Sequence, residues 1–172
     1  MMLKNIVLEA KEIWYKEDCA AKEAVWLLRG ANLQIPEGDF IAILGDSETG
    51  TVLLKVLSFR LLPTKGTVYF EGRLVGRNGI EEIVQMQRER VWYLKGTINN
   101  SQLRLERHQR LAAVLLDEPL IEDEAALAAL LAQIVNLNQA GVAVLVASQE
   151  PGLAAQASEI YKLVDGKLKK LT

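Results

Sequence analysis

The chain has 172 residues, of which half are apolar, 6% are aromatic and 24% are charged, and its net charge is −2. This length and composition favour one soluble globular domain with a substantial core, and the near-neutral charge gives no basic surface for DNA or RNA. No apolar run approaches the roughly 20 residues that span a bilayer, and the N-terminus lacks a signal-peptide profile. The single cysteine, Cys19, excludes an internal disulfide and fits a reducing compartment.

The N-terminal residues predict a layer of antiparallel strands. Two strands are expected over residues 3–10 and 12–15, and a third over residues 25–28. Turn-forming residues at 36–39 then lead into an apolar strand at residues 40–44. Because the first segments are short and separated by turns, they favour an antiparallel β layer ahead of an α/β core.

A phosphate-loop spacing follows the strand at residues 40–44. Gly45 and Gly50 enclose four residues, and a helix carrying apolar residues from Leu53 to Leu62 comes next. In such a loop, glycines let successive backbone N–H groups face an anion at the N-terminus of the helix. The residues expected to form this loop and contact a nucleotide are Gly45, Asp46, Ser47, Glu48, Thr49, Gly50, Thr51 and Val52.

The full motif continues Gly-Lys-Ser/Thr, and here Gly50 is followed by Thr51 and Val52. Counted forward from Gly45, Thr51 takes the lysine position and Val52 takes the position of the magnesium-binding hydroxyl. Counted back from the helix, the loop is one residue short, and Thr51 takes the hydroxyl position. Neither register supplies an ammonium group from the loop.

Two carboxylates, Asp46 and Glu48, lie within the same loop. A pair of like charges about 5 Å apart repels by roughly 3 kcal/mol at an effective dielectric constant of about 20, and exposure to solvent reduces this figure. We therefore expect nucleotide binding that is weaker than in an intact loop. The alternative is an ordinary strand-to-helix turn that contains two glycines.

A second motif joins an apolar strand at residues 112–116 to the acids Asp117 and Glu118, with Pro119 next. The carboxyl edge of a parallel sheet is where ligands bind in open α/β folds. In a phosphate-hydrolysing site Asp117 would hold Mg²⁺, and Glu118 would orient and deprotonate the attacking water. The alternative is a solvated acid pair at the end of a strand.

The rest of the chain is expected to alternate strands with helices, most clearly in a β-α-β-α-β pattern in the C-terminal half. Three arginines of one predicted helix are interpreted as a solvated face in preference to a phosphate site; they are Arg104, Arg107 and Arg110. The further predicted strands are residues 67–70, 91–94, 142–147 and 160–164, and the predicted helices are residues 80–90, 101–111, 122–139 and 152–157.

The order of these segments resembles the nucleotide-binding domain of ATP-binding cassette (ABC) transporters. The resemblance covers most of the chain, and it implies a P-loop NTPase-like α/β fold: a mostly parallel sheet flanked by helices, with an N-terminal antiparallel β layer. It also implies ATP and Mg²⁺ as cofactors. The segments that carry it are residues 28–38, 45–54, 63–66, 115–119, 144–148 and 163–168.

Several positions depart from the family's pattern. The phosphate-loop lysine has no counterpart, and Gln149 stands at the position of the switch histidine, where its amide cannot carry a positive charge. Lys95 stands where the family has a glutamine, and the signature motif is reduced to residues 99–102. Tyr15 is the candidate for the aromatic residue that stacks on adenine.

The resemblance also implies a helical subdomain between Thr97 and the acidic strand. Only 20 positions separate Thr97 from Asp117, so we expect residues 1–172 to form a single domain in which this subdomain is reduced to about residues 98–111. In the family, that subdomain docks on the membrane subunit and supplies the signature motif.

Three functions agree with these observations. The first is a degenerate cassette subunit that binds nucleotide weakly or not at all and works beside a membrane permease, a second ABC ATPase subunit in a homo- or heterodimer, or both. The second is a functional ATPase that drives transport, and the third is a regulatory or scaffold protein on the same fold. The first ranks highest because the lysine, the histidine and the signature are absent together. It predicts a cytoplasmic protein at the inner face of the membrane.

Overall fold

The computed structural model describes residues 3–18, 20, 23–76, 79–99, 102–103 and 110–171. Its strands form a four-stranded sheet in the order β2-β1-β4-β5, here called sheet A, and a six-stranded sheet in the order β10-β9-β3-β8-β7-β6, here called sheet B. The strands are β1 (Ile6–Glu17), β2 (Val25–Pro36), β3 (Phe40–Gly45), β4 (Lys65–Phe70), β5 (Arg73–Val75), β6 (Val91–Lys95), β7 (Ala113–Asp117), β8 (Ala143–Ala147), β9 (Glu159–Val164) and β10 (Lys167–Lys170).

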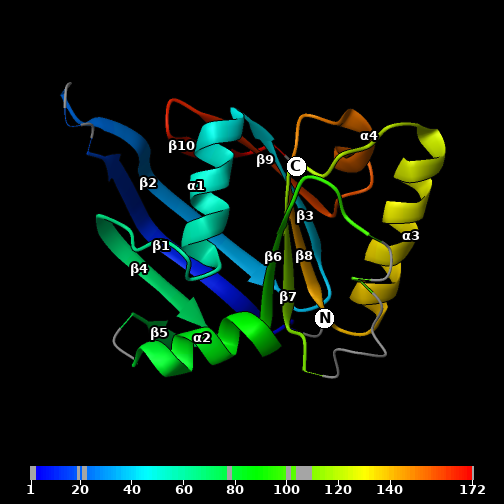
Figure 1. Ribbon diagram of the computed structural model, residues 1–172, viewed down its shortest axis with the longest axis horizontal. Helices are drawn as coiled ribbons and strands as arrows, with labels where there is room; N and C mark the ends of the chain where they lie inside the picture. The colour runs from blue at the N-terminus through cyan, green and yellow to red at the C-terminus, as the bar shows by residue number, and fades with distance from the viewer. Residues whose placement is uncertain are drawn as a thin grey trace.

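Sheet A is antiparallel throughout, and sheet B is parallel except for the edge strand β10. The helices are α1 (Ser47–Leu57), α2 (Ile80–Glu89), α3 (Glu124–Gln139) and α4 (Pro151–Ala154). Helix α1 lies between the two sheets, and α3 covers the opposite face of sheet B (Figure 1). This arrangement confirms the predicted fold class. In the described part of the chain, no helix is both long enough and apolar enough to cross a membrane.

Strand alternation divides the core into two clusters on either side of sheet B. Leu115 and Leu145 pack with α1 and sheet A, whereas Val114 and Val144 pack with α3. Successive side chains of a strand point to opposite faces of the sheet. Because both faces of β7 and β8 are buried, these strands are continuous apolar runs. Odd-numbered residues of β7 therefore face α1.

Two segments differ from the sequence-based expectation. The strands predicted over residues 3–10 and 12–15 are one strand, β1, in which a bulge at Glu12 (φ 49°) shifts the register and absorbs the irregular hydrophobic pattern. The helix α1 begins at Ser47 and ends at Leu57, so it starts inside the predicted loop and stops before Leu62. The helix predicted over residues 101–111 lies mostly outside the described residues.

Leu115→Ala tests the cluster between sheet B and α1. The Leu115 side chain is 0% exposed, and truncation of such a residue leaves a cavity that costs about 2–5 kcal/mol of unfolding free energy. Urea denaturation followed by tryptophan fluorescence measures the loss. Val135→Ala on the exposed side of α3 is the control, with an expected change below about 0.5 kcal/mol. A loss below about 1 kcal/mol for Leu115→Ala would contradict the packing described above.

Candidate functional site

The parallel strands of sheet B bring the sequence motifs to one edge. Ile43 of β3 pairs with Ala147 of β8, Ala147 pairs with Asp117 of β7, and Asp117 pairs with Lys95 of β6. The carboxyl ends of four strands therefore lie at the same level, which is where open α/β sheets bind ligands. Asp46 and Glu118 follow directly after β3 and β7, and Gln149 is the second residue after β8.

The first turn of α1 occupies the place expected for the phosphate loop. Asp46 is the N-cap residue, and its carboxylate accepts the backbone N–H of Thr49 at 2.9 Å and the Thr49 hydroxyl. The side-chain hydrogen bond from Thr49 holds the pKa of Asp46 below its ordinary value. Ser47 and Glu48 are exposed in this turn, and Val52 is buried one turn later. An internal carboxylate thus satisfies the helix N-terminus, where a phosphate binds in a phosphate loop.

Packing requires one of the two glycines of the motif. Gly45 has φ 145°, and a Cβ atom there would lie 2.5 Å from the carbonyl oxygen of Leu163 on β9. Close approach of β9 therefore accounts for glycine at position 45. Gly50 lies within α1, where a Cβ atom would make ordinary van der Waals contact with Ala147 at 3.4 Å.

Asp117 is the centre of a buried polar cluster. Its side chain is 0% exposed. The Thr51 hydroxyl lies 2.8 Å from Oδ2 and 3.0 Å from Oδ1, and the Tyr93 hydroxyl also donates to Oδ2. The Lys95 ammonium lies 3.2 Å from Oδ2 and 3.0 Å from the Thr51 hydroxyl. Burial, and then the hydrogen bond to Asp117, raises the pKa of Tyr93, so Tyr93 keeps its proton and acts as a donor at neutral pH.

Lys95 and Tyr93 are the residues that the sequence reasoning missed. It sought the ammonium inside the loop, whereas the ammonium comes from the end of β6, 44 positions after Thr51. The available signal was the strand pairing: Lys95 ends β6 beside Asp117, and residues 93, 95 and 117 share the face toward α1. The bond from Thr51 to Asp117 favours the register in which Thr51 takes the hydroxyl position.

The cluster around Asp117 does not fit a resident Mg²⁺. In phosphate-binding loops Mg²⁺ is held by one hydroxyl, one acid, water and the phosphates of the nucleotide, and Thr51 and Asp117 are the residues that would hold it here. The Lys95 ammonium already contacts both Asp117 and Thr51. An ammonium and a divalent ion about 4 Å apart repel by about 8 kcal/mol at an effective dielectric constant of about 20, less where water screens them.

Glu118 lies just outside this cluster in a strained conformation. Its φ is 44°, which is uncommon for a side-chain-bearing residue and more so before a proline. Its backbone N–H donates to the carbonyl of Ala147. Burial, followed by the neighbouring Asp117 charge, raises the pKa of Glu118, and Lys95 opposes this shift. A carboxyl group with a raised pKa is suited to proton transfer near neutral pH.

The two other predicted contact residues are engaged elsewhere. The Gln149 amide donates to the carbonyl of Gly45 at 3.3 Å, so it ties β8 to the start of the α1 turn. Tyr15 is half-buried and packs against the core between the sheets. Beside it, Trp14 makes an edge-to-face contact with Trp26, with 5.4 Å between ring centroids. The remnant of the signature at residues 99–102 lies partly outside the described residues.

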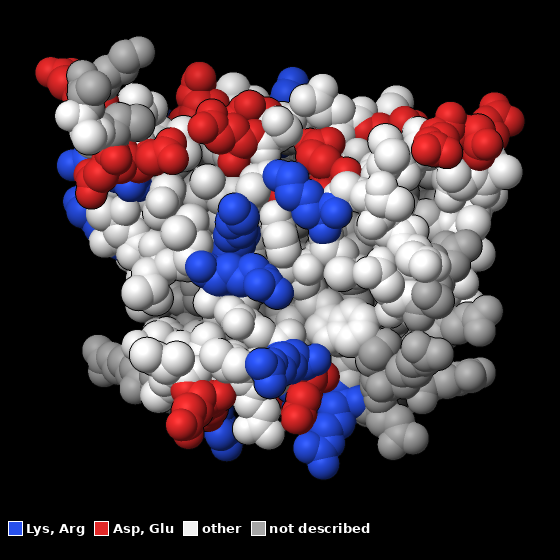
Figure 2. Space-filling view, viewed as in Figure 1, with Lys and Arg blue, Asp and Glu red and all other residues white. Residues whose placement is uncertain are grey.

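Acidic side chains gather along the carboxyl edge of sheet B. Figure 2 shows them as a band at the top of the molecule, where α1 and α3 begin. The exposed acids that follow β3 and β7 at this edge are Asp46, Glu48, Glu122, Asp123 and Glu124. These carboxylates concentrate negative charge along this edge.

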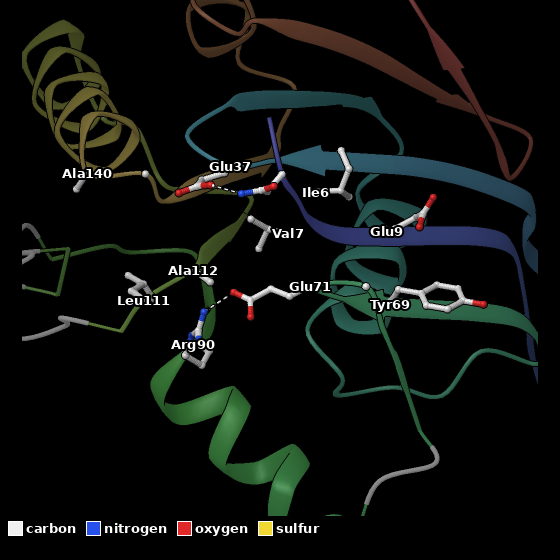
Figure 3. A pocket seen from close by; sticks show the side chains of 13 residues that line it. Ile6, Val7, Glu9, Glu37, Tyr69, Glu71, Arg90, Leu111, Ala112 and Ala140 are labelled. Carbon is white, nitrogen blue, oxygen red and sulfur yellow. Dashed lines mark hydrogen bonds and ion pairs between the residues drawn. The ribbon is translucent and has the colours of Figure 1, made fainter. Parts of the chain in front are cut away.

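A cavity of about 530 Å³ lies away from this edge, beside the amino end of β7. Arg90 and Glu71 point toward one another across it and form an ion pair (Figure 3). No residue of the predicted phosphate loop and neither acid of the β7 motif lines this cavity.

No protein-family model matches the chain, but stretches of it match ABC transporter proteins. An uncharacterized ABC transporter ATP-binding protein of Thermotoga maritima is 31% identical over 94 residues, which are 54% of this chain and 40% of that protein. The lipoprotein-releasing system ATP-binding protein LolD of Acinetobacter baylyi is 38% identical over 68 residues, covering 39% and 29% of the two chains. The matched stretches thus span less than half the length of these relatives.

Solved structures extend the likeness to the whole fold. The ATP-binding cassette MJ0796, determined as a dimer bound to ADP and Pi, superposes with a TM-score of 0.77 at 17% identity over 96% of this chain and 99% of that one. The chain has the fold of an ATP-binding cassette. CbiO1 of Clostridium perfringens, part of an ABC transporter complex, gives a TM-score of 0.74 at 14% identity, covering 96% and 87% of the chains. The resemblance seen in the sequence is confirmed.

Asp46→Ala tests the capping of α1 by the Asp46 side chain. Loss of an N-cap carboxylate costs about 1 kcal/mol of unfolding free energy at pH 7, whereas Glu48→Ala costs only a few tenths. Because the folded-state pKa of Asp46 is lowered, its contribution is present above the unfolded value of about 3.9 and disappears as the pH falls further. Urea denaturation from pH 7 to pH 2 should show the two proteins converging in acid. Equal stability at pH 7 would contradict the cap.

Proposed function

We propose that the chain is a degenerate ABC-type subunit of a membrane transporter complex, with weak or absent nucleotide binding and no hydrolysis of its own. The observation that carries the proposal is the capping of α1 by Asp46. In a working phosphate loop the N–H groups of this turn face the nucleotide. Here the carboxylate already uses the N–H of Thr49, and Gly50 donates to the Asp46 carbonyl within the helix.

Electrostatics support the same conclusion. A phosphate charge about 4 Å from the Asp46 carboxylate is repelled by about 4 kcal/mol at an effective dielectric constant of about 20, less at this exposed position. Each 1.4 kcal/mol changes affinity by about tenfold. The Lys95 ammonium is ion-paired with Asp117, so binding a phosphate through it would break that pair. We therefore assign Asp117 and Thr51 a structural role in place of the Mg²⁺-binding role that the resemblance implies.

The partner in this proposal is a membrane permease, a second ABC ATPase subunit, or both. Support comes from the functions of similar proteins, which include EcfA1, an energy-coupling factor transporter ATP-binding protein of Clostridium novyi that is 36% identical over 67 residues. The chain would then work at the inner face of the membrane. The short segment at about residues 98–111, in place of a full helical subdomain, gives it a reduced docking surface and leaves catalysis to the partner.

A functional ATPase is the second candidate, and Glu118 favours it. This residue combines a strained backbone, a raised pKa and a place at the carboxyl edge of sheet B, which are properties of catalytic bases. It would need a positively charged group from a partner chain to stabilise the transferred phosphoryl group.

Titration with Mg-ATP tests the proposal. With a dissociation constant near 1 mM, 1 mM Mg-ATP should raise the melting temperature by less than about 2 °C. Asp46→Gly, which removes both the cap and the charge, should bind more tightly than the wild type. The control Glu48→Gln removes a charge and leaves the cap, so it should bind less tightly than Asp46→Gly. A rise of several degrees at micromolar ATP in the wild type would refute the proposal.

Phosphate release separates the two candidates. The wild type and Glu118→Gln should both show only the background rate of phosphate release from Mg-ATP when alone, and after addition of a co-purified cassette or permease both should show the same rate, set by the partner. A wild-type rate at least about tenfold above that of Glu118→Gln, a difference of about 1.4 kcal/mol in activation free energy, would establish the ATPase instead.

A further inference from the structure

Lys95 contacts two other residues of the Asp117 cluster. Its ammonium contacts Asp117 Oδ2 at 3.2 Å and Thr51 Oγ1 at 3.0 Å. In phosphate-binding loops, Mg²⁺ is held by a hydroxyl on the helix that follows the loop and by an acid at the end of another strand. We infer that the Lys95 ammonium is the resident counter-cation of this site and takes the place of a divalent metal ion.

The backbone fixes Lys95 for this role. Lys95 and Asp117 are paired neighbours on adjacent parallel strands. The N–H of Gly96 donates to the Asp117 carbonyl at 3.1 Å, which holds the end of β6 against β7. Since both side chains face α1, the ammonium reaches the carboxylate without leaving the edge of the sheet. The cation is therefore supplied at a fixed position by the chain itself.

Asp117 also accepts hydrogen bonds from two hydroxyl groups. Thr51 and Tyr93 donate to the carboxylate from α1 and β6, and Arg60 lies over the Tyr93 ring, 5.4 Å from its centroid. A metal ion bound to Asp117 Oδ2 would have to displace Lys95 and the Tyr93 hydroxyl from that oxygen. The Lys95 ammonium would also repel the incoming charge.

This inference concerns the metal ion alone and does not depend on nucleotide binding or on a partner. If the chain proved to bind Mg-ATP, the proposed function would fail, whereas the assignment of Lys95 would still be decided by metal titration without nucleotide. The two results are therefore distinguishable.

Lys95→Met provides the test, with Mn²⁺ as the probe and electron paramagnetic resonance as the measure of bound metal. The wild type should bind no Mn²⁺ below about 1 mM and should keep its melting temperature in 5 mM MgCl₂. Lys95→Met exposes the Asp117 carboxylate to the metal, so it should melt about 5 °C lower and regain at least half of this loss in about 1 mM Mn²⁺. Adding Asp117→Asn to this variant should abolish the Mn²⁺ response.

Lys170→Met is the matched control. Lys170 forms an ion pair with Glu159 at 2.9 Å, and its side chain is 52% exposed, compared with 54% for Lys95, but Glu159 is not fully buried. This variant should show no metal-dependent recovery. Lys95→Arg keeps the charge and should exclude Mn²⁺ as the wild type does.

Two results would overturn the inference. The first is wild-type Mn²⁺ affinity within about threefold of that of Lys95→Met, a difference of about 0.7 kcal/mol or less. The second is a folded Lys95→Met that binds no Mn²⁺. If Lys95→Met does not fold, the wild type is titrated with micromolar Mn²⁺ and the NMR signals of the Tyr93 ring are followed. Broadening of these signals would refute the assignment of Lys95. Unchanged signals would support it.

Discussion

The carboxylate of Asp117 must be neutralised, because it is fully buried at the end of an interior strand of sheet B. An unpaired buried charge is among the most destabilising features that a protein can contain. In this chain the groups that contact the carboxylate come from α1 and β6, which both precede β7 in the sequence. Neutralising Asp117 therefore couples α1 to β6. The same requirement determines which side chains lie together at the carboxyl edge of sheet B.

The cassette fold provides the geometry for that coupling. Parallel pairing sets the ends of β3, β8, β7 and β6 at one level, and strand alternation turns Lys95 and Asp117 toward α1. A nucleotide-binding cassette uses this edge for phosphate and metal. The same edge is here occupied by the protein's own groups: a carboxylate at the helix N-terminus and an ammonium at the acid of β7. In the proposed function, these two internal ions take the places of the ligand's phosphate and its metal.

Much of the fold could be predicted from the sequence, because the buried parallel strands are continuous apolar runs and α3 has clear helical periodicity. The site was harder to predict. The spacing of Gly45 and Gly50 suggested a phosphate loop, although Asp46 three residues before Thr49 is also an N-cap pattern. The structure decides in favour of the N-cap, because the Asp46 side chain accepts the N–H of Thr49. Lys95 was missed because its partner, Thr51, belongs to a different βα unit, and single-sequence patterns do not report such contacts.

Helix α1 contacts both sheets at once, as Figure 1 shows, and its buried side chains belong to the cluster shared by sheets A and B. Thr49 and Gly50, in its first turns, are already buried, so unwinding this turn into an open loop would expose part of the core that both sheets share. The packing of sheet A against sheet B is thus coupled to the conformation of the first turn of α1.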